Sequence, residues 1–263
     1  MSEATGELGS PTRDWDAAVY DRVADPQEAW GREVLERLPL RGEETVLDAG
    51  CGSGRVTELL LERLPRGRVI GVDSASAMIE RARERLGDRV DLRVGDLTEL
   101  PLEGEVDAVF SNAVFHWIPD HERLFVRLHN ALRPGGRLAA QCGAKGNVAR
   151  VREAIVAAYA ESDFSTVERP PRGTWNFAGP EETEARLQAA GFEAVEVWVT
   201  ERPSTPSEPH AFLRTCVLGP HLERMPETLH PRFVASVAER LGEPPVFDYV
   251  RLNIAARRPS ASG

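Results

Sequence analysis

Short apolar runs alternate with helical patterns between Glu44 and Gly143. The runs read TVLDAG, RVIGVD, VDLRVGD, VDAVFSN and GRLAAQCG, and leucines at helical spacing follow Gly54 and Pro119. A strand that is followed by a helix and then by a second strand forms a right-handed parallel unit. The alternation therefore predicts an α/β fold, built on a doubly wound and mostly parallel sheet.

The chain beyond Gly143 adds two strand patterns, AVEVWVT and FDYVRLNIAAR, which complete a predicted seven-stranded sheet. A long segment with helical spacing separates these two strands, and a connection of that length is rarely only a linker, so we interpret it as a helical lid. We expect a flexible start (1–12), one domain (13–257) with lid elements at about 13–35, 145–180 and 201–246, and a flexible tail (258–263).

Composition narrows the possible partners. A net charge of -10 disfavours binding to nucleic acids and acidic membranes, which need a basic surface. The three cysteines are far apart, so they indicate neither a disulfide framework nor a zinc site. The chain shows no signal peptide and no apolar run of membrane-spanning length. We therefore expect a cytoplasmic protein, a monomer or homodimer, that acts on a small molecule.

The segment VLDAGCGSGRV joins the first predicted strand to the first helix and spaces three glycines as GxGxG. Glycine lets the backbone turn sharply and lets a ligand lie against bare peptide groups at a helix N-terminus. Asp73 ends the next predicted strand, where a carboxylate can accept hydrogen bonds from both hydroxyls of a ribose. A tight turn without a ligand is the alternative, and the full pattern favours a nucleoside-bearing ligand.

NAD fits this loop poorly. A dinucleotide loop reads GxGxxG, but Arg55 stands where the third glycine would be. Asp48, just before the loop, has the wrong charge for a pyrophosphate.

The sequence resembles the class I S-adenosylmethionine-dependent methyltransferases, which have a Rossmann-like fold. The segments LDAGCGSG, GVDSASAMI, GDLTELP, DAVFSNAVFHW and LRPGGRLA match the family in order, and the resemblance spans roughly Asp14 to Arg257. Within the family, DWDAAVYDRVADPQEAW, SNAVFHWIPDH and the long lid look like the trans-aconitate, juvenile hormone acid and fatty acid methyltransferases, all of which esterify carboxylates. The resemblance implies S-adenosyl-L-methionine as the cofactor.

The resemblance also implies roles for individual residues of the cofactor site. Asp73 would hold the ribose, a plain helix cap is the less favoured alternative for Asp96, and Met78 could equally be core filler. The residues that would line the cofactor site are Asp48, Gly50, Gly52, Ser53, Asp73, Ser74, Met78, Asp96, Leu97 and Asn112, with Trp15 and Tyr20 in an N-terminal segment that folds over the cofactor.

The acceptor site is expected around His116 and Trp117, which follow the fourth predicted strand. Ligands of open α/β sheets bind beyond the carboxyl ends of the strands, and an aromatic face near a sulfonium is favourable. In the juvenile hormone acid group a glutamine and a tryptophan orient the acceptor carboxylate, and Gln27 and Trp117 fall at matching places. Structural roles for His116 and Trp117 remain possible, and Arg251 is either an anion partner or an ordinary strand-surface arginine. His116 and His121 do not have the spacing of a metal site.

A carboxylic acid has a pKa of about 4, so it is already ionised at neutral pH and needs no general base. Alignment and exclusion of water then provide most of the catalysis, with Gln27, His116 and Trp117 holding the acid. Two alternatives stay open. One is an O-, N- or C-methyltransferase of another small molecule that uses His116 as a general base. The other is a cofactor-binding module without turnover.

Overall fold

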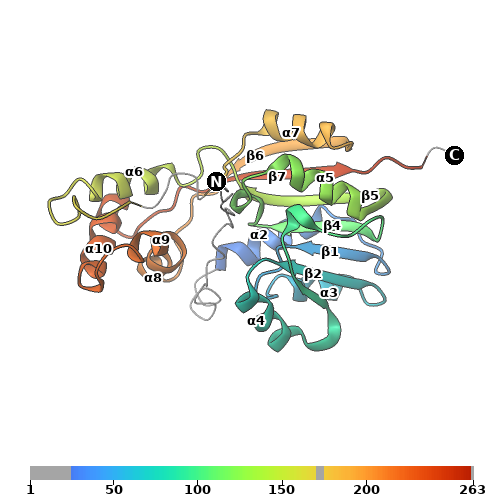
Figure 1. Cartoon of the computed structure of the whole chain (residues 1–263), viewed down its shortest axis with the longest axis horizontal. Helices are drawn as coiled ribbons and strands as arrows, with labels where there is room; N and C mark the ends of the chain where they lie inside the picture. Colours follow the sequence, from blue (N-terminus) through green and yellow to red (C-terminus); the bar gives the residue numbers. More distant parts are fainter. Residues whose placement is uncertain (1–24, 170–174, 262–263) are drawn as a thin grey trace, which may run out of the picture.

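The computed structural model describes residues 25–169 and 175–261. Seven strands form one sheet in the order β3-β2-β1-β4-β5-β7-β6 (Figure 1). Strand β7 runs antiparallel to β5 and β6, and the other neighbouring pairs are parallel. The strands are β1 (Thr45–Ala49), β2 (Arg68–Asp73), β3 (Asp91–Val94), β4 (Val106–Asn112), β5 (Leu132–Gly143), β6 (Glu193–Glu201) and β7 (Val250–Arg257).

Helices cover both faces of the sheet, as a doubly wound fold requires. On one face, α2 (Asp25–Glu36), α3 (Thr57–Arg63) and α4 (Ser76–Leu86) bury their apolar sides against the strands. On the other face, α5 (His121–Ala131) and α7 (Pro180–Ala189) do the same. The predicted fold class is therefore confirmed.

The remaining helices gather beside the sheet, on the left of Figure 1. They are α6 (Ala149–Ala158), α8 (Pro209–Phe212), α9 (Gly219–Leu222) and α10 (His230–Leu241), and a π-helical turn (Leu213–Val217) follows α8. We call these elements the lid. The lid has an apolar core of its own, which also contains Trp30 of α2, so this helix joins the lid to the sheet.

The sequence signals for helix ends correspond to observed caps. The backbone N–H of Arg123 donates to the side chain of Asp120, which caps α5 at the start predicted by Pro119-Asp120. Helix α5 ends at Ala131, one residue before RPGG, and those four residues already belong to β5. Short 3₁₀ turns complete the set: η1 (Gly87–Arg89), η2 (Leu97–Glu99), η3 (Phe115–Trp117) and η5 (Glu227–Leu229).

Ordered contacts continue past residue 257, where the sequence analysis places the start of the tail. One Nη of Arg258 donates to the backbone carbonyls of His129, Asn130 and Leu132, and its backbone N–H donates to Gly136. The domain limits otherwise stay predictions, and residues 1–24 lie outside the described residues. Among the helices of the described ranges, none has the length and apolar character needed to span a membrane.

Candidate active site

The glycine loop between β1 and α3 has two packed glycines and one open glycine. A Cβ on Gly50 would come within 2.2 Å of Val114, and a Cβ on Gly54 within 2.6 Å of Leu86. A Cβ on Gly52 would meet nothing within 4 Å, although its φ of +54° also favours glycine. Packing within the protein therefore requires two of the glycines, whereas Gly52 leaves its backbone open to a ligand.

The backbone of the loop fixes the carboxylate of Asp73 at the end of β2. One oxygen accepts the N–H of Gly52 at 3.0 Å, and the other accepts the N–H of Ala75 at 2.9 Å. Burial raises the pKa of this carboxyl, and the backbone hydrogen bonds from Ala75, Gly52 and Ser74 oppose that shift. The result is a half-buried acceptor with a fixed orientation, which suits a vicinal diol.

Asp48 lies beneath the same loop, 2% exposed, and accepts a hydrogen bond from the hydroxyl of Thr57 at 2.7 Å. Burial raises its pKa to about 7, and the negative charge of Asp73 adds to the effect. Two neighbouring carboxyls in a poorly solvated site make it favourable for a cation. Ser53 of the loop is also buried.

The residues predicted at the edge of the cofactor site differ in their surroundings. Asp96 is exposed and caps η2, because its Oδ1 accepts from the N–H and the hydroxyl of Thr98 at 2.7 and 2.8 Å. Leu97 belongs to the core cluster of the α5 face. Met78 is buried in α4, and Ser74 is exposed.

Strand β4 ends at Asn112, beside β5, and the chain then turns through Ala113, which has a φ of +63°. The backbone N–H of Ala113 donates to the backbone carbonyl of Gln141 at 2.7 Å and stabilises this turn. A Cβ on Gly31 of α2 would lie 3.3 Å from the amide nitrogen of Asn112, so α2 crosses close to the carboxyl end of β4.

His116 follows in η3, with 8% of its surface exposed. Its Nδ1 accepts the backbone N–H of Gly143 at 3.2 Å. Burial holds its pKa well below the ordinary histidine value, and the charges of Arg251 and His121 lower it further. The imidazole is therefore neutral, and because Nδ1 acts as an acceptor, the proton resides on Nε2.

An aromatic cluster surrounds His116. Its ring stacks on Phe177 with centroids 5.7 Å apart and lies 5.1 Å from Trp117, and Trp175 contacts both Trp117 and Phe177. Asn176 attaches this second segment to η3, because its backbone N–H donates to the carbonyl of His116 and its amide to that of Pro119. Trp175 and Phe177 were not among the predicted site residues, and their one sequence signal is an aromatic pair two residues apart in a polar stretch.

Helix α2 connects the cofactor loop to β7. Glu28 forms an ion pair with Arg55 of the loop at 2.9 Å. Two residues further along α2, the ring of Trp30 lies 4.4 Å from the guanidinium carbon of Arg251, which is 2% exposed. Arg251 is therefore buried rather than on the strand surface, and Trp30 is a third site residue that was not predicted from the sequence.

Gln27 lies one helical turn before Trp30 in α2, and its side chain is outside the described residues, as are Trp15 and Tyr20. The structure thus brings the loop, Asp48, Asp73, Asn112, His116 and Trp117 to one end of the sheet, whereas Asp96 lies at its exposed margin. Within the described ranges, no group of three His, Cys, Asp or Glu side chains is arranged to hold a metal ion.

A glycine loop and two strand-end carboxyls, on a seven-stranded sheet with one antiparallel strand, define a Rossmann-like enzyme that binds a nucleoside with a cationic group. A family model described as a methyltransferase domain matches residues 47–140. The trans-aconitate 2-methyltransferase of Azoarcus sp. (strain BH72) is 34% identical over 236 residues, which covers 84% of this chain and 87% of that protein.

A second relative carries the same name, and two solved structures share the fold. The protein of the same name from Variovorax paradoxus (strain S110) is 43% identical over 129 residues, and this match covers 49% of each chain. A solved structure of phosphoethanolamine N-methyltransferase 2 from Haemonchus contortus, in complex with S-adenosyl-L-methionine, has a TM-score of 0.58 at 21% identity, covering 88% of this chain and 53% of that one. The YcgJ protein from Bacillus subtilis has a TM-score of 0.62 at 16% identity, covering 88% and 98%.

The chain belongs to the class I S-adenosylmethionine-dependent methyltransferases, and S-adenosyl-L-methionine is its cofactor. The residues of the site fit S-adenosyl-L-methionine. The open backbone at Gly52 leaves room for it, the anchored carboxylate of Asp73 suits its ribose, and the buried carboxyl of Asp48 suits its positive charges.

Proposed function

We propose that the enzyme transfers the methyl group of S-adenosylmethionine to a carboxylate of a small acid and forms a methyl ester. One observation carries this proposal. The backbone N–H of Gly143 donates a hydrogen bond to Nδ1 of His116, so the proton of the neutral ring is on Nε2. A donor of this kind can hold an anionic oxygen, but it has no lone pair with which to take a proton.

This protonation state argues against the main alternative chemistry. A phenol or an amine must lose a proton during methyl transfer, and a histidine that serves as general base needs an unprotonated nitrogen facing the acceptor. The low pKa of His116, caused by burial and by Arg251, also makes it a weak base. A carboxylate is ionised before it binds and needs no such base.

The names of the relatives suggest a first candidate for the methyl acceptor. The proteins from Azoarcus and Variovorax carry the name trans-aconitate 2-methyltransferase, and the first of them aligns over most of both chains. We therefore propose a small polycarboxylic acid, with trans-aconitate as the first candidate.

Each group of residues has a proposed role in the reaction. When bound, S-adenosylmethionine would supply an electrophilic methyl group: the acceptor attacks the methyl carbon opposite the sulfur, the bond from sulfur to methyl breaks, and S-adenosylhomocysteine leaves. Asp73 and the glycine loop fix the ribose, and Asp48 lies near the methionine ammonium. The further proposed cofactor contacts are Gly50, Ser53, Ser74, Met78, Asp96, Leu97, Asn112, Trp15 and Tyr20.

On the acceptor side, the N–H of His116 and the side chain of Gln27 hold the carboxylate, and the ring of Trp117 borders the sulfonium. The aromatic cluster of His116, Trp117, Trp175 and Phe177 limits water around the reacting atoms. Both charges disappear as the ester forms, so a dry site favours the reaction, and positioning contributes most of the rate. We further propose a cytoplasmic enzyme that acts as a monomer or homodimer.

A panel of acceptors tests the proposal. Purified enzyme is incubated with S-adenosylmethionine and, separately, with trans-aconitate, a fatty acid, a phenol and a primary amine, and products are identified by the mass of one added methyl group. Methylation of an acid is the expected result. Methylation of the phenol or the amine, with no acid methylated, would overturn the proposal.

A further inference from the structure

Arg251 is a buried cation at the acceptor end of the sheet. Its register partner on β5 is Gly143, the residue whose N–H holds the ring of His116. Trp30 stacks on the guanidinium, and Nε donates to Oε1 of Gln141 at 3.3 Å. Burying a guanidinium is costly, and such a charge beside a ligand site is a candidate for binding an anion.

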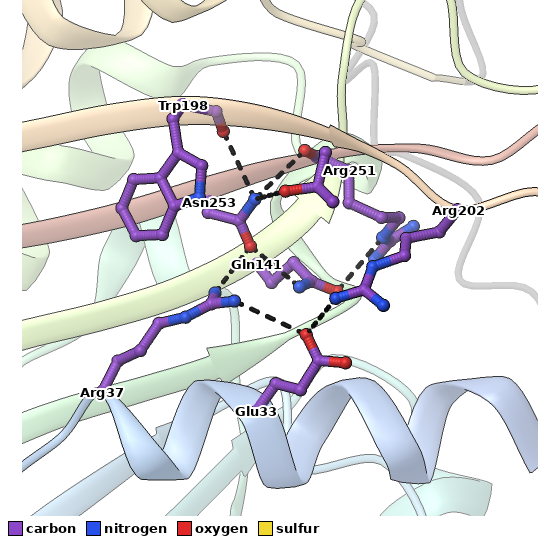
Figure 2. Close-up of polar contacts among 8 residues, drawn as sticks. Glu33, Arg37, Gln141, Trp198, Arg202, Arg251 and Asn253 are labelled. Atoms are coloured by element: carbon purple, nitrogen blue, oxygen red, sulfur yellow. Dashed lines mark hydrogen bonds and ion pairs between the residues drawn. The ribbon is translucent and has the colours of Figure 1, made fainter.

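A chain of amides determines the direction of this guanidinium (Figure 2). Asn253, fully buried, accepts Nη1 of Arg37 at 2.6 Å and Nε2 of Gln141 at 2.9 Å on its oxygen. Its nitrogen donates to the carbonyl of Trp198 and the hydroxyl of Thr200. With the nitrogen of Gln141 committed to Asn253, its oxygen must face Arg251.

The positive field of Arg251 reaches the groups around it. It lowers the pKa of His116, in addition to the larger effect of burial, and it partly opposes the burial that raises the pKa of the Cys142 thiol to about 12. The ring of Trp30 lies over the face of the guanidinium, and Gln141 accepts a hydrogen bond from its Nε. A carboxylate binds a guanidinium in a different way, through two parallel N–H donors in the plane of the group.

We propose that Arg251 binds a second carboxylate of the acceptor, one that is not methylated, and that Gln141 and Asn253 are positioning residues that aim its guanidinium. The proposal rests on the carboxylate chemistry proposed above. A tight ion pair with the reacting carboxylate would draw electron density away from the nucleophile, so the cation is better placed on another carboxylate of the same molecule. Arg251 then selects polycarboxylic acids over monocarboxylic acids.

Calorimetry on the complex with S-adenosylhomocysteine measures acceptor binding without turnover. The probes are trans-aconitate, with three carboxylates, and crotonate, with one. Arg251→Gln is expected to weaken trans-aconitate binding about 10- to 100-fold, as expected when a charged hydrogen bond is lost, and to change crotonate binding less than about twofold. Arg251→Lys should give an intermediate loss, because it keeps the charge without the planar fork.

Arg257→Gln is the matched control, since Arg257 is the exposed arginine at the opposite end of the same strand. It should bind both acids as the wild type does. Melting curves and affinity for S-adenosylhomocysteine show whether each variant is folded. Equal binding of trans-aconitate by Arg251→Gln and the wild type would overturn the assignment.

The positioning role has a separate test. Gln141→Leu leaves Arg251 in place but removes the acceptor at its Nε, so KM for trans-aconitate should rise about tenfold while KM for crotonate and affinity for the cofactor stay unchanged. Equal losses for both acids would indicate a purely structural role and contradict the proposal.

Assays of the wild-type enzyme with both acids distinguish failure of the role of Arg251 from failure of the carboxylate chemistry. Methylation of crotonate but not of trans-aconitate would overturn the role of Arg251 and leave carboxylate chemistry intact. If no acid is methylated, the proposed function falls and the role of Arg251 falls with it.

Discussion

The cofactor half of the sheet and the acceptor half hold their polar groups in different ways. Around β1 and β2, one loop and the next strand end supply the site, and backbone N–H groups of Gly52 and Ala75 fix Asp73. Around β4, β5 and β7, side chains that are far apart in the sequence meet, among them Trp30, His116 and Arg251.

Because of this difference, substitutions in the two halves should affect different properties of the enzyme. A substitution in the cofactor half changes a site made by neighbouring residues, so it should alter cofactor binding or stability but not the choice of acceptor. A substitution in the acceptor half changes one member of an assembled set, so it should alter the choice and rate of the acceptor.

Asp73→Ala should have the largest effect. Loss of the charged acceptor for the ribose hydroxyls should weaken S-adenosylmethionine binding about 100- to 1000-fold, or roughly 3 to 4 kcal/mol, by calorimetry. Asp91→Ala is the control, because Asp91 is an exposed acidic residue at the start of β3 that pairs with Arg93. Full-strength uptake of the cofactor by Asp73→Ala would contradict the assignment of the cofactor half.

Asp48 should make the free enzyme lose stability as the pH rises. Its pKa is about 7 in the folded protein and near 3.8 when unfolded, so the folded state holds a proton that the unfolded state releases. This stability is complete below pH 4 and is lost as the pH rises through 7. Asp48→Asn should remove this part of the pH dependence, which amounts to about 4 kcal/mol.

Chemical denaturation of the wild type and Asp48→Asn at several pH values measures this difference. Parallel curves for the two proteins between pH 4 and pH 8 would show that Asp48 is not the titrating group.

Two glycines of one loop should respond differently to alanine. Gly52→Ala places its Cβ in open space, so stability should fall by only about 1 kcal/mol for the left-handed backbone, while cofactor affinity should fall about tenfold or more. Gly50→Ala drives its Cβ into Val114 and should lower the melting temperature far more. Unchanged cofactor affinity in Gly52→Ala would remove the open glycine from the site.

His116→Ala should have the smallest effect. Loss of one hydrogen-bond donor to the acceptor should lower kcat/KM for an acid about tenfold. Because the pKa of His116 lies well below its ordinary value, the wild-type rate should stay flat from pH 6 to pH 9. A loss of about 100-fold, with a rate that falls steeply below pH 7, would instead identify His116 as a general base.

The sequence predicted most of the fold, because strand and helix signals in this chain are local. The glycine loop and Asp73 could be predicted as a cofactor site for the same reason, because their spacing along the chain is itself the pattern that indicates such a site. Trp175, Phe177 and the Gln141–Asn253 pair could not be found in this way. Each lies in an ordinary strand or polar segment, and only the pairing of β5 with β7 and the packing of residues 175–177 on η3 bring them to the acceptor end.

The burial of Arg251 could not be predicted from the sequence. Its position in a predicted strand allowed either an exposed or a buried side chain, and the packing of α2 against β4 and β5 decided the outcome. Gly31 lets α2 approach the end of β4, and Trp30 then covers the guanidinium. No local pattern in either segment encodes that contact.

The response of the product to alkali distinguishes a methyl ester from any other methylated product. The enzyme is supplied with S-adenosylmethionine labelled on the methyl carbon and with trans-aconitate, and the product is analysed before and after mild alkali. Carboxylate methylation predicts a labelled ester whose methyl group is released as methanol by alkali. A label that survives alkali on oxygen, nitrogen or carbon would contradict the account.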